Sequence, residues 1–342
     1  MCKVDGITAI QLLPGVQSTS EGSSGVRVRG GSRGQNLILR DEATVYSASR
    51  LMGFFSLFNN DAVKDVTLYK GDIPATFGGR LSSLMDIRTK DGNNQRFTGT
   101  GGLGLISSRL TLEGPIGSDR ATFLVSGRRT YADLFLKLSN DKDIRDNTLY
   151  FYDLNAKVNY RISDNDRIYI AGYFGKDNFS TRFAGMDFGN STVTARWNHI
   201  FSPKLFSNFT LLGSFYNYRL NTDLSEQIKE ECKSKMNDYG FKADFSYHPN
   251  PSDNIKFGYN ATYHNFIPGE GGGIGEESIV GKITFPKEYA LEHAAYVANE
   301  MTIAEKLKLK YGLRYSIFQN IANGEELKYM NNYQVEYTKK YE

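Results

Sequence analysis

The stretch YFYDLNAKVNYRI, residues 150–162, decides the fold class of this chain. Its even-numbered positions are apolar or aromatic, whereas its odd-numbered positions from Asp153 onward carry a charged or amide side chain. Successive side chains of a β-strand point to opposite faces of a sheet, so the pattern predicts a strand with one apolar and one polar face. The same alternation returns over 239–247, 255–263 and 307–315. Repetition of such segments indicates the wall of a barrel.

Ten long strand candidates follow one another from about residue 96, and a further one begins near 333. They are 96–114, 119–133, 148–162, 166–178, 189–202, 204–221, 237–249, 253–267, 288–303 and 305–320. Short links alternate with longer ones, the longer ones lying near 134–147, 179–188, 222–236, 268–287 and 321–332. This arrangement is typical of up-and-down outer-membrane barrels, with tyrosines near the strand ends at the lipid boundary. A soluble sandwich also alternates, but its strands usually have only about five or six residues.

The composition agrees with a mainly β protein. Tyr and Phe number 22 each, with 34 Gly and 8 Pro, which favours strands and turns. The net charge is +3 and the basic residues are dispersed, so nucleic-acid binding is not indicated. Cys2 and Cys232 form no C-x-x-C spacing, and the four histidines lie on four separate strand candidates. The sequence therefore predicts no disulfide framework, no metal site and no cofactor.

Residues 1–92 differ from the rest of the chain. Short apolar runs separated by Gly, Ser and Asp predict the strands of a small mixed α/β domain, with a short helical turn over 61–64. The polar segment 90–95 is the predicted linker. We therefore expect a domain over 1–92 and a barrel segment over 93–342.

Several motifs of the first domain resemble, in order, the plug domain of TonB-dependent outer-membrane receptors, particularly their Bacteroidetes-type branch. The matching segments are LLPGV at 12–16, VRVRGG at 26–31, NLILRD at 36–41 followed by Val45 and Tyr46, and the region from Val66 to Ile87. One position departs from the family, which usually has aspartate-glycine where this chain has Asp41-Glu42. A turn that needs a positive φ there would be strained by glutamate.

The resemblance implies a receptor whose barrel has about 22 strands, of which the chain would supply about 10 or 11. The sequence shows no export signal, so we expect the signal peptide and the N-terminal TonB-contacting segment to be missing, and the plug to be N-terminally truncated. The implied function is energy-coupled uptake of a scarce solute across the cell outer membrane, such as a siderophore, cobalamin, an oligosaccharide or a peptide. The implied partners are TonB, outer-membrane lipid, the imported solute and, as a further candidate, a surface lipoprotein. The alternative is a receptor barrel for surface binding or signalling without import.

Candidate site residues come from the plug motifs. Gly30, Gly31, Gly78 and Gly79 allow backbone conformations and close approaches that a Cβ would block. By resemblance, the neighbouring Arg29 and Arg80 are expected to meet carboxylates of the barrel wall. The aromatic connection 46–59 is expected near the plug apex, which makes Arg50, Phe54 and Phe55 candidates for solute contact, with packing against the wall as the alternative.

Catalytic motifs are not indicated. Residues 99–104 satisfy G-x-G-x-x-G, but a strand pattern follows them where a dinucleotide site needs a helix. No nucleophile elbow is present, and no carboxylate pair stands out that would support a polysaccharide-processing enzyme. We therefore expect a transporter or receptor and not an enzyme.

Overall fold

The computed structural model of the chain describes residues 10–18, 26–46, 49–50, 55–56, 59–225, 228–274, 278–304, 307–321, 324–329 and 335–341. Strands dominate these residues, and they form one large antiparallel sheet and several small ones. Among the described residues, no helix is both long and apolar enough to span a membrane.

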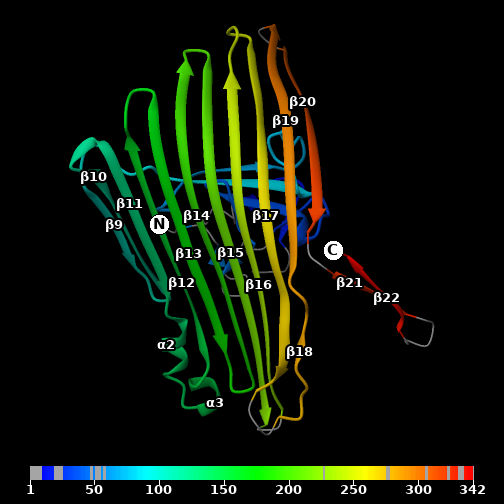
Figure 1. Ribbon diagram of the computed structural model, residues 1–342. Helices are drawn as coiled ribbons and strands as arrows, with labels where there is room; N and C mark the ends of the chain where they lie inside the picture. The colour runs from blue at the N-terminus through cyan, green and yellow to red at the C-terminus, as the bar shows by residue number, and fades with distance from the viewer. Residues whose placement is uncertain are drawn as a thin grey trace.

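The large sheet has twelve strands and is an antiparallel meander (Figure 1). Each long strand pairs with the next one along the chain, and the short β18 (Ile283–Thr284) pairs with β17. The long strands are β9 (Thr98–Leu103), β10 (Ser107–Ile116), β11 (Ser118–Thr130), β12 (Thr148–Arg161), β13 (Asp166–Ser180), β14 (Ala184–Ser202), β15 (Leu205–Ser225), β16 (Ile228–Tyr247), β17 (Asp253–Gly273), β19 (Glu288–Ala304) and β20 (Leu307–Asn320).

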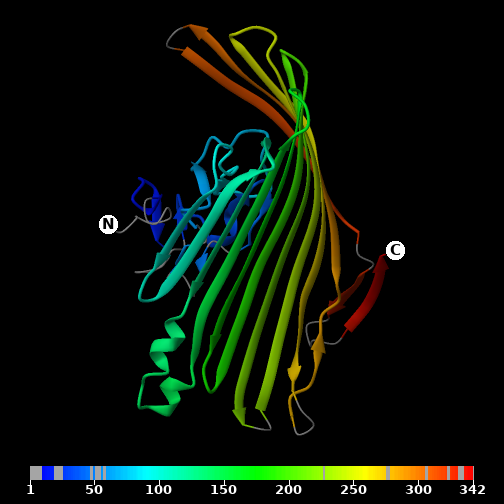
Figure 2. The ribbon, with the colours of Figure 1, turned by 90° about the vertical axis from the view of Figure 1, so that its left-hand side faces the viewer.

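The two faces of this sheet differ in chemistry, as the alternation predicts. On β12, Leu154 and Val158 are 47% and 40% exposed, whereas Asn155 and Lys157 between them are buried. The buried polar face is covered by the N-terminal domain, which Figure 2 shows lying within the curve of the sheet. Apolar side chains therefore cover the outer face of a partial barrel, and polar side chains line the inner face.

The N-terminal domain is built on a mixed four-stranded sheet in the order β4 (Ala43–Thr44), β3 (Asn36–Arg40), β8 (Ser83–Thr89), β7 (Val63–Tyr69), with β3 parallel to β8. Two hairpins and a short 3-10 helix accompany it: β1 (Val16–Ser18) with β2 (Val26–Val28), β5 (Ser49–Arg50) with β6 (Phe55–Ser56), and η1 (Arg33–Gln35). Val28, Ile38, Met85 and Ile87 pack in its core together with Tyr173 of β13. The helical turn expected over 61–64 is confined to residues 60–62, because β7 already begins at Val63.

Two strand predictions differ from the structure. Residues 96–114 form the hairpin β9–β10 and not one strand, since the backbone turns between Gly104 and Ser107. The apolar pattern concealed this turn, because Leu105 and Ile106 within it are apolar yet exposed. The final strand, β22 (Val335–Tyr341), pairs with β21 (Gly324–Tyr329) in a separate hairpin and does not join the barrel sheet.

Two of the predicted long loops are also strand. The segments 179–188 and 222–236 belong to the β13–β14 and β15–β16 hairpins apart from short connections. Cross-strand polar contacts support them, such as Asn178 Nδ2 to Asp187 Oδ1 at 2.5 Å and Arg219 Nε to Glu231 Oε1 at 3.4 Å. The backbones of neighbouring strands stay paired beyond the part of the sheet whose outer face is apolar. In these outlying segments the sequence no longer alternates between apolar and polar residues. The loop predicted at 134–147 contains the short helix α3 (Lys142–Arg145), and α2 (Ala132–Leu136) begins just before it.

The connection between the N-terminal domain and the sheet is held against the wall. Gly92 has φ +86°, and a Cβ there would lie 2.4 Å from the backbone oxygen of Phe123 in β11. Asn159 Nδ2 donates to the carbonyl oxygen of Asp91 at 2.7 Å. Residue 92 must therefore be glycine for the chain to pass this close to the barrel wall.

Candidate functional site

The hairpin β3–β4 and the residues after it carry the main polar contacts between the N-terminal domain and the barrel wall. Arg40 is only 1% exposed, donates from Nη2 to Asn155 on β12 and lies 4.3 Å over the ring of Tyr173 on β13. Ser214 on β15 donates to the carbonyl oxygen of Thr44. A single short hairpin thus contacts several neighbouring strands.

Glu42 stands at the tip of this hairpin in a left-handed conformation, with φ +76°. Its Oε1 lies 3.1 Å from Arg196 Nη1 on β14, and its Oε2 lies 3.0 Å from Lys242 Nζ on β16. Burial disfavours the charged carboxylate, but Lys242 and Arg196 outweigh burial, so the pKa of Glu42 lies below its ordinary value. The turn therefore has a positive φ at the position where the family usually has glycine, and here a glutamate that binds two wall cations occupies it.

A second ionic group joins the N-terminal domain to β12. Lys157 Nζ lies 3.5 Å from Asp41 Oδ1 and 2.8 Å from Asp91 Oδ1, and it donates to the carbonyl oxygen of Thr89 at 2.8 Å. Further along the same wall, Asp61 pairs with Arg109 at 2.8 Å. All of these ion pairs place the carboxylate on the N-terminal domain and the cation on the wall.

The two arginines selected from the sequence lie in different surroundings. Arg29 is exposed, its guanidinium lies along Gly71, and no wall carboxylate pairs with it among the described residues. Arg80 donates to its neighbour's carbonyl, Gly79 O, at 2.8 Å and lines a cavity together with Glu292 of β19. The arginine that is buried against the wall is Arg40, which sequence reasoning missed.

The four candidate glycines occupy two kinds of site. Gly30 and Gly79 have φ values of +76° and +84°. A Cβ at Gly31 would lie 2.3 Å from Ser82 Oγ within the domain, and a Cβ at Gly78 would lie 2.5 Å from Arg314 Nε on β20. Arg314 also donates to the carbonyl oxygens of Ala75 and Thr76, at 3.3 and 3.4 Å. The loop 75–79 therefore lies directly on β20, and Gly78 allows that approach.

Two adjoining cavities, of about 350 and 110 Å³, lie where the N-terminal domain meets β16, β17, β19 and β20. Both are lined by Tyr46, Arg80, His264 and Glu292. The Tyr46 hydroxyl donates to Asp238, which pairs through Oδ1 with His264 Nδ1 at 2.8 Å. The larger cavity is completed by Met236, Phe266, Ile317 and Phe318, among others. It combines charged groups with aromatic faces and offers several ways to bind an organic solute.

Burial and the neighbouring Asp238 carboxylate raise the pKa of Tyr46, so its phenol stays protonated and acts as a donor at neutral pH. The candidates for solute contact chosen from the sequence, Arg50, Phe54 and Phe55, stay predictions. Arg50 and Phe55 pair through the backbone in the hairpin β5–β6, whereas Phe54 and the side-chain positions of all three lie outside the described residues. Among the described residues, no group of three or more His, Cys, Asp or Glu could hold a metal ion.

Comparison with known proteins identifies the N-terminal domain. Residues 4–83 match the family model of the TonB-dependent receptor plug domain. No curated protein sequence matches the chain.

Solved structures match both parts of the fold. The copper transporter OprC has 14% identity and a TM-score of 0.71, over 92% of this chain and 51% of that one. The outer-membrane transporter YddB from Escherichia coli has 14% identity and a TM-score of 0.65, over 91% and 54%. A mutant of the ferric enterobactin receptor PfeA from Pseudomonas aeruginosa has 15% identity and a TM-score of 0.62, over 92% and 55%. The chain thus spans about half the length of these proteins. Its N-terminal domain thus matches the TonB-dependent receptor plug domain over residues 4–83, and the sheet around it has the fold of part of the barrel of these solved structures.

Proposed function

We propose that the chain is part of a TonB-dependent receptor of the cell outer membrane that imports a scarce solute by energy coupling. One observation carries this proposal: the plug domain lies on the buried polar face of a sheet whose opposite face exposes apolar side chains. Lipid on the outer face and a plug within the barrel are what such transport requires. The Bacteroidetes-type likeness, a domain boundary near residue 92 and a surface lipoprotein partner are further predictions.

The chemistry of the plug–wall interface supports a plug that can move. Arg40, Glu42 and Lys157 join the two parts through hydrogen bonds and ion pairs, whereas the apolar core lies mainly within the plug. Polar groups that separate can exchange their partners for water, so displacement costs less than exposing a hydrophobic core. TonB, acting on a segment N-terminal to the plug, would supply the work of displacement.

We assign the rim that carries α2, α3 and β18 to the cell exterior. Two of its connections, between β11 and β12 and between β17 and β19, are the longest in the sheet, whereas the opposite rim has the short turns 162–165, 203–204 and 248–252. Outer-membrane barrels carry short turns on the periplasmic side and longer loops outside. The solute would therefore reach the plug from the end of the barrel that bears α2 and α3.

Import can be tested with radiolabelled ferric enterobactin, cyanocobalamin, a copper salt and a maltooligosaccharide as probes. The full-length receptor would be expressed in cells with and without TonB, and both bound and internalised label would be counted. We expect one probe to accumulate inside TonB-containing cells and to stay at the surface when TonB is absent or a proton ionophore is added. Equal internalisation without TonB would contradict the proposal. Surface binding that never leads to uptake would favour the alternative, a receptor for attachment or signalling.

The cavity at Arg80 gives a more specific prediction. Replacing Arg80 by alanine should weaken binding of the imported probe by about 10-fold or more, since hydrogen bonds to charged groups contribute about 1.5–3 kcal/mol. Arg29→Ala is the matched control, because Arg29 is an exposed plug arginine outside the cavity. Equilibrium binding to whole cells measures both variants. Equal losses for the two arginines, or none for Arg80, would remove this cavity from the binding site.

A further inference from the structure

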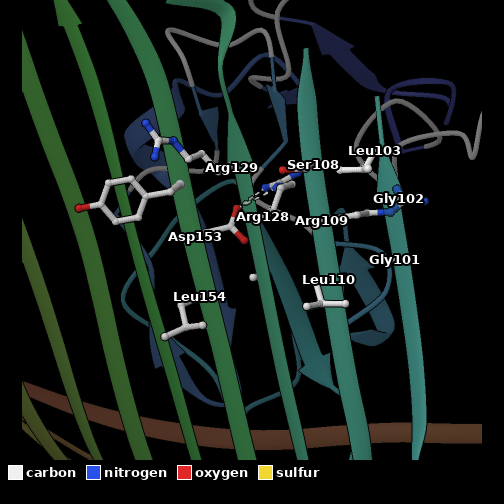
Figure 3. A pocket seen from close by; sticks show the side chains of 12 residues that line it. Gly101, Gly102, Leu103, Ser108, Arg109, Leu110, Arg128, Arg129, Asp153 and Leu154 are labelled. Atoms are coloured by element: carbon white, nitrogen blue, oxygen red, sulfur yellow. Dashed lines mark hydrogen bonds and ion pairs between the residues drawn. The ribbon is translucent and has the colours of Figure 1, made fainter. Parts of the chain in front are cut away.

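A groove of about 870 Å³ crosses β9, β10, β11 and β12 (Figure 3). The strand register places Gly101, Leu110, Gly127 and Leu154 in one row across the four strands. Figure 3 shows Leu110 and Leu154 on either side of β11. Because two interstrand spacings separate these leucines by roughly 10 Å, the glycine between them leaves a furrow open along the strand.

The furrow belongs to the outer, apolar face of the sheet. Leu154 shares this face with Val158, whereas the Arg128–Asp153 ion pair, 2.5 Å long, lies on the opposite face and is nearly buried. Leu103, Leu110 and Leu154 are all exposed. A hydrocarbon chain laid in the furrow would bury these leucines and contact the glycine backbone closely.

One end of the furrow is cationic. The next outward-facing row of residues lies two positions along each strand, toward the rim with α2 and α3. In this row Tyr152 of β12 lies between Arg129 of β11 and Lys176 of β13. Arg129 is exposed and stacks on Tyr150, with 5.6 Å between its guanidinium carbon and the ring centroid. Among the described residues Arg129 pairs with no carboxylate, whereas Lys176 lies 3.8 Å from Asp187. An uncompensated guanidinium next to an apolar furrow complements an amphiphile with an anionic head and a hydrocarbon tail.

We propose that this groove binds one lipopolysaccharide molecule of the outer leaflet, with an acyl chain along Gly127 and a headgroup phosphate at Arg129. The proposal rests on the proposed function, since it needs the outer face to be in an outer membrane with this rim outside. Arginine binds phosphate oxygens in a bidentate manner, and the tyrosines beside it lie where aromatic girdles meet lipid headgroups. The groove and Arg129 together therefore form one position on the outer face of the wall that binds this lipid in preference to the other lipids around it.

The test uses the full-length receptor extracted from outer membranes in mild detergent, with bound lipid identified by native mass spectrometry. Gly127→Leu fills the furrow, and Arg129→Gln removes the charge. Gly172→Leu is the matched control, because Gly172 also faces outward, next to Ala156 and Val193, and has similar free space around it. We expect the unmodified receptor and Gly172→Leu to retain one lipopolysaccharide molecule, and the other two variants to lose at least 10-fold in occupancy.

Equal lipopolysaccharide retention by all four proteins, no retention by any of them, or preferential retention of phosphatidylglycerol would overturn the proposal. The same preparations also test the membrane assignment through heat modifiability in gel electrophoresis. Correctly inserted receptors that carry no lipopolysaccharide would contradict only the groove. A receptor absent from the outer membrane would contradict the proposed function itself.

Discussion

Replacing Lys157 by methionine is expected to weaken the attachment of the plug by about 3 kcal/mol, the lower end of the range for breaking a buried ion pair. Lys157 is 4% exposed and binds Asp41, Asp91 and the carbonyl oxygen of Thr89. Methionine keeps most of the volume but removes the cation that the two carboxylates share, so that Asp91 is left with Lys64 at 3.6 Å. The lower end applies because Asp91 is 38% exposed and Asp41 keeps its hydrogen bond from Thr89 N at 3.1 Å.

The measurement is the urea concentration at which a protease first cleaves the plug of the full-length receptor in detergent. Lys176→Met is the control, because Lys176 lies on the neighbouring strand with its side chain 40% exposed, and a surface pair contributes at most about 1 kcal/mol. The Lys157 variant should be cleaved at a clearly lower urea concentration than both the control and the unmodified receptor. Cleavage of the two variants at the same urea concentration would mean that the ion pairs of Lys157 do not hold the plug.

Substitutions of Glu42 are expected to have the second large effect on plug attachment. Two variants separate the contribution of its ion pairs from the cost of its left-handed backbone. Glu42→Ala removes both ion pairs and leaves Arg196 and Lys242 without their carboxylate, at a cost of about 3 kcal/mol. Glu42→Gly removes the same ion pairs but also relieves the left-handed backbone, which costs an L-residue about 1–2 kcal/mol. We therefore expect plug attachment to be strongest in the unmodified receptor, intermediate in Glu42→Gly and weakest in Glu42→Ala.

The same urea and protease assay ranks the three proteins. Identical midpoints for the glycine and alanine variants would show that the positive φ stores no strain. If both variants were cleaved at the same urea concentration as the unmodified receptor, the two ion pairs of Glu42 would contribute nothing to attachment. Restoring the charge with Glu42→Asp should recover part of the loss, because a shorter carboxylate still reaches toward the cations.

The pH dependence of attachment follows from the direction of the Glu42 pKa. The pKa lies below its ordinary value in the docked plug, since Lys242 and Arg196 outweigh burial. A carboxyl group of this kind contributes its stability above the pKa of the detached state and loses it as the pH falls through the docked pKa. The contribution of Glu42 to attachment should thus be complete at neutral pH, begin to fall near the ordinary glutamate pKa of about 4.3, and vanish only once the pH is below the lower pKa of the docked plug. In Glu42→Gly, this part of the pH dependence should be absent.

The sequence predicted the parts of the fold that depend on local pattern. The alternation over 150–162 predicted a strand with two different faces. The sequence also singled out Glu42 as a residue that a positive φ would strain, and its φ is +76°. Local pattern failed at the turn between β9 and β10, because that turn contains apolar residues such as Leu105. It also failed where strands continue as polar segments beyond the part of the sheet whose outer face is apolar.

The contacts between the plug and the wall were the least predictable feature. Arg40 and its acceptor Asn155 are 115 residues apart, and each carries a polar side chain that also suits a solvated surface. Arg29 beside two glycines looked the stronger candidate, yet it is exposed. The only signal for Arg40 is its place directly after the apolar run Leu37-Ile38-Leu39, which puts its strand in the plug core. Which wall residues it meets depends on the curvature and register of the whole sheet.

The most direct test of a plugged, lipid-facing wall is spin labelling of single cysteines at positions 153–160 of the full-length receptor in outer membranes, with Cys2 and Cys232 replaced by serine. Collisions with oxygen, which concentrates in lipid, and with a water-soluble nickel chelate would be measured at each position. We expect strong oxygen contact at positions 154, 156, 158 and 160, and protection from both reagents at 153, 155, 157 and 159. Equal access of the nickel chelate to odd and even positions would contradict it.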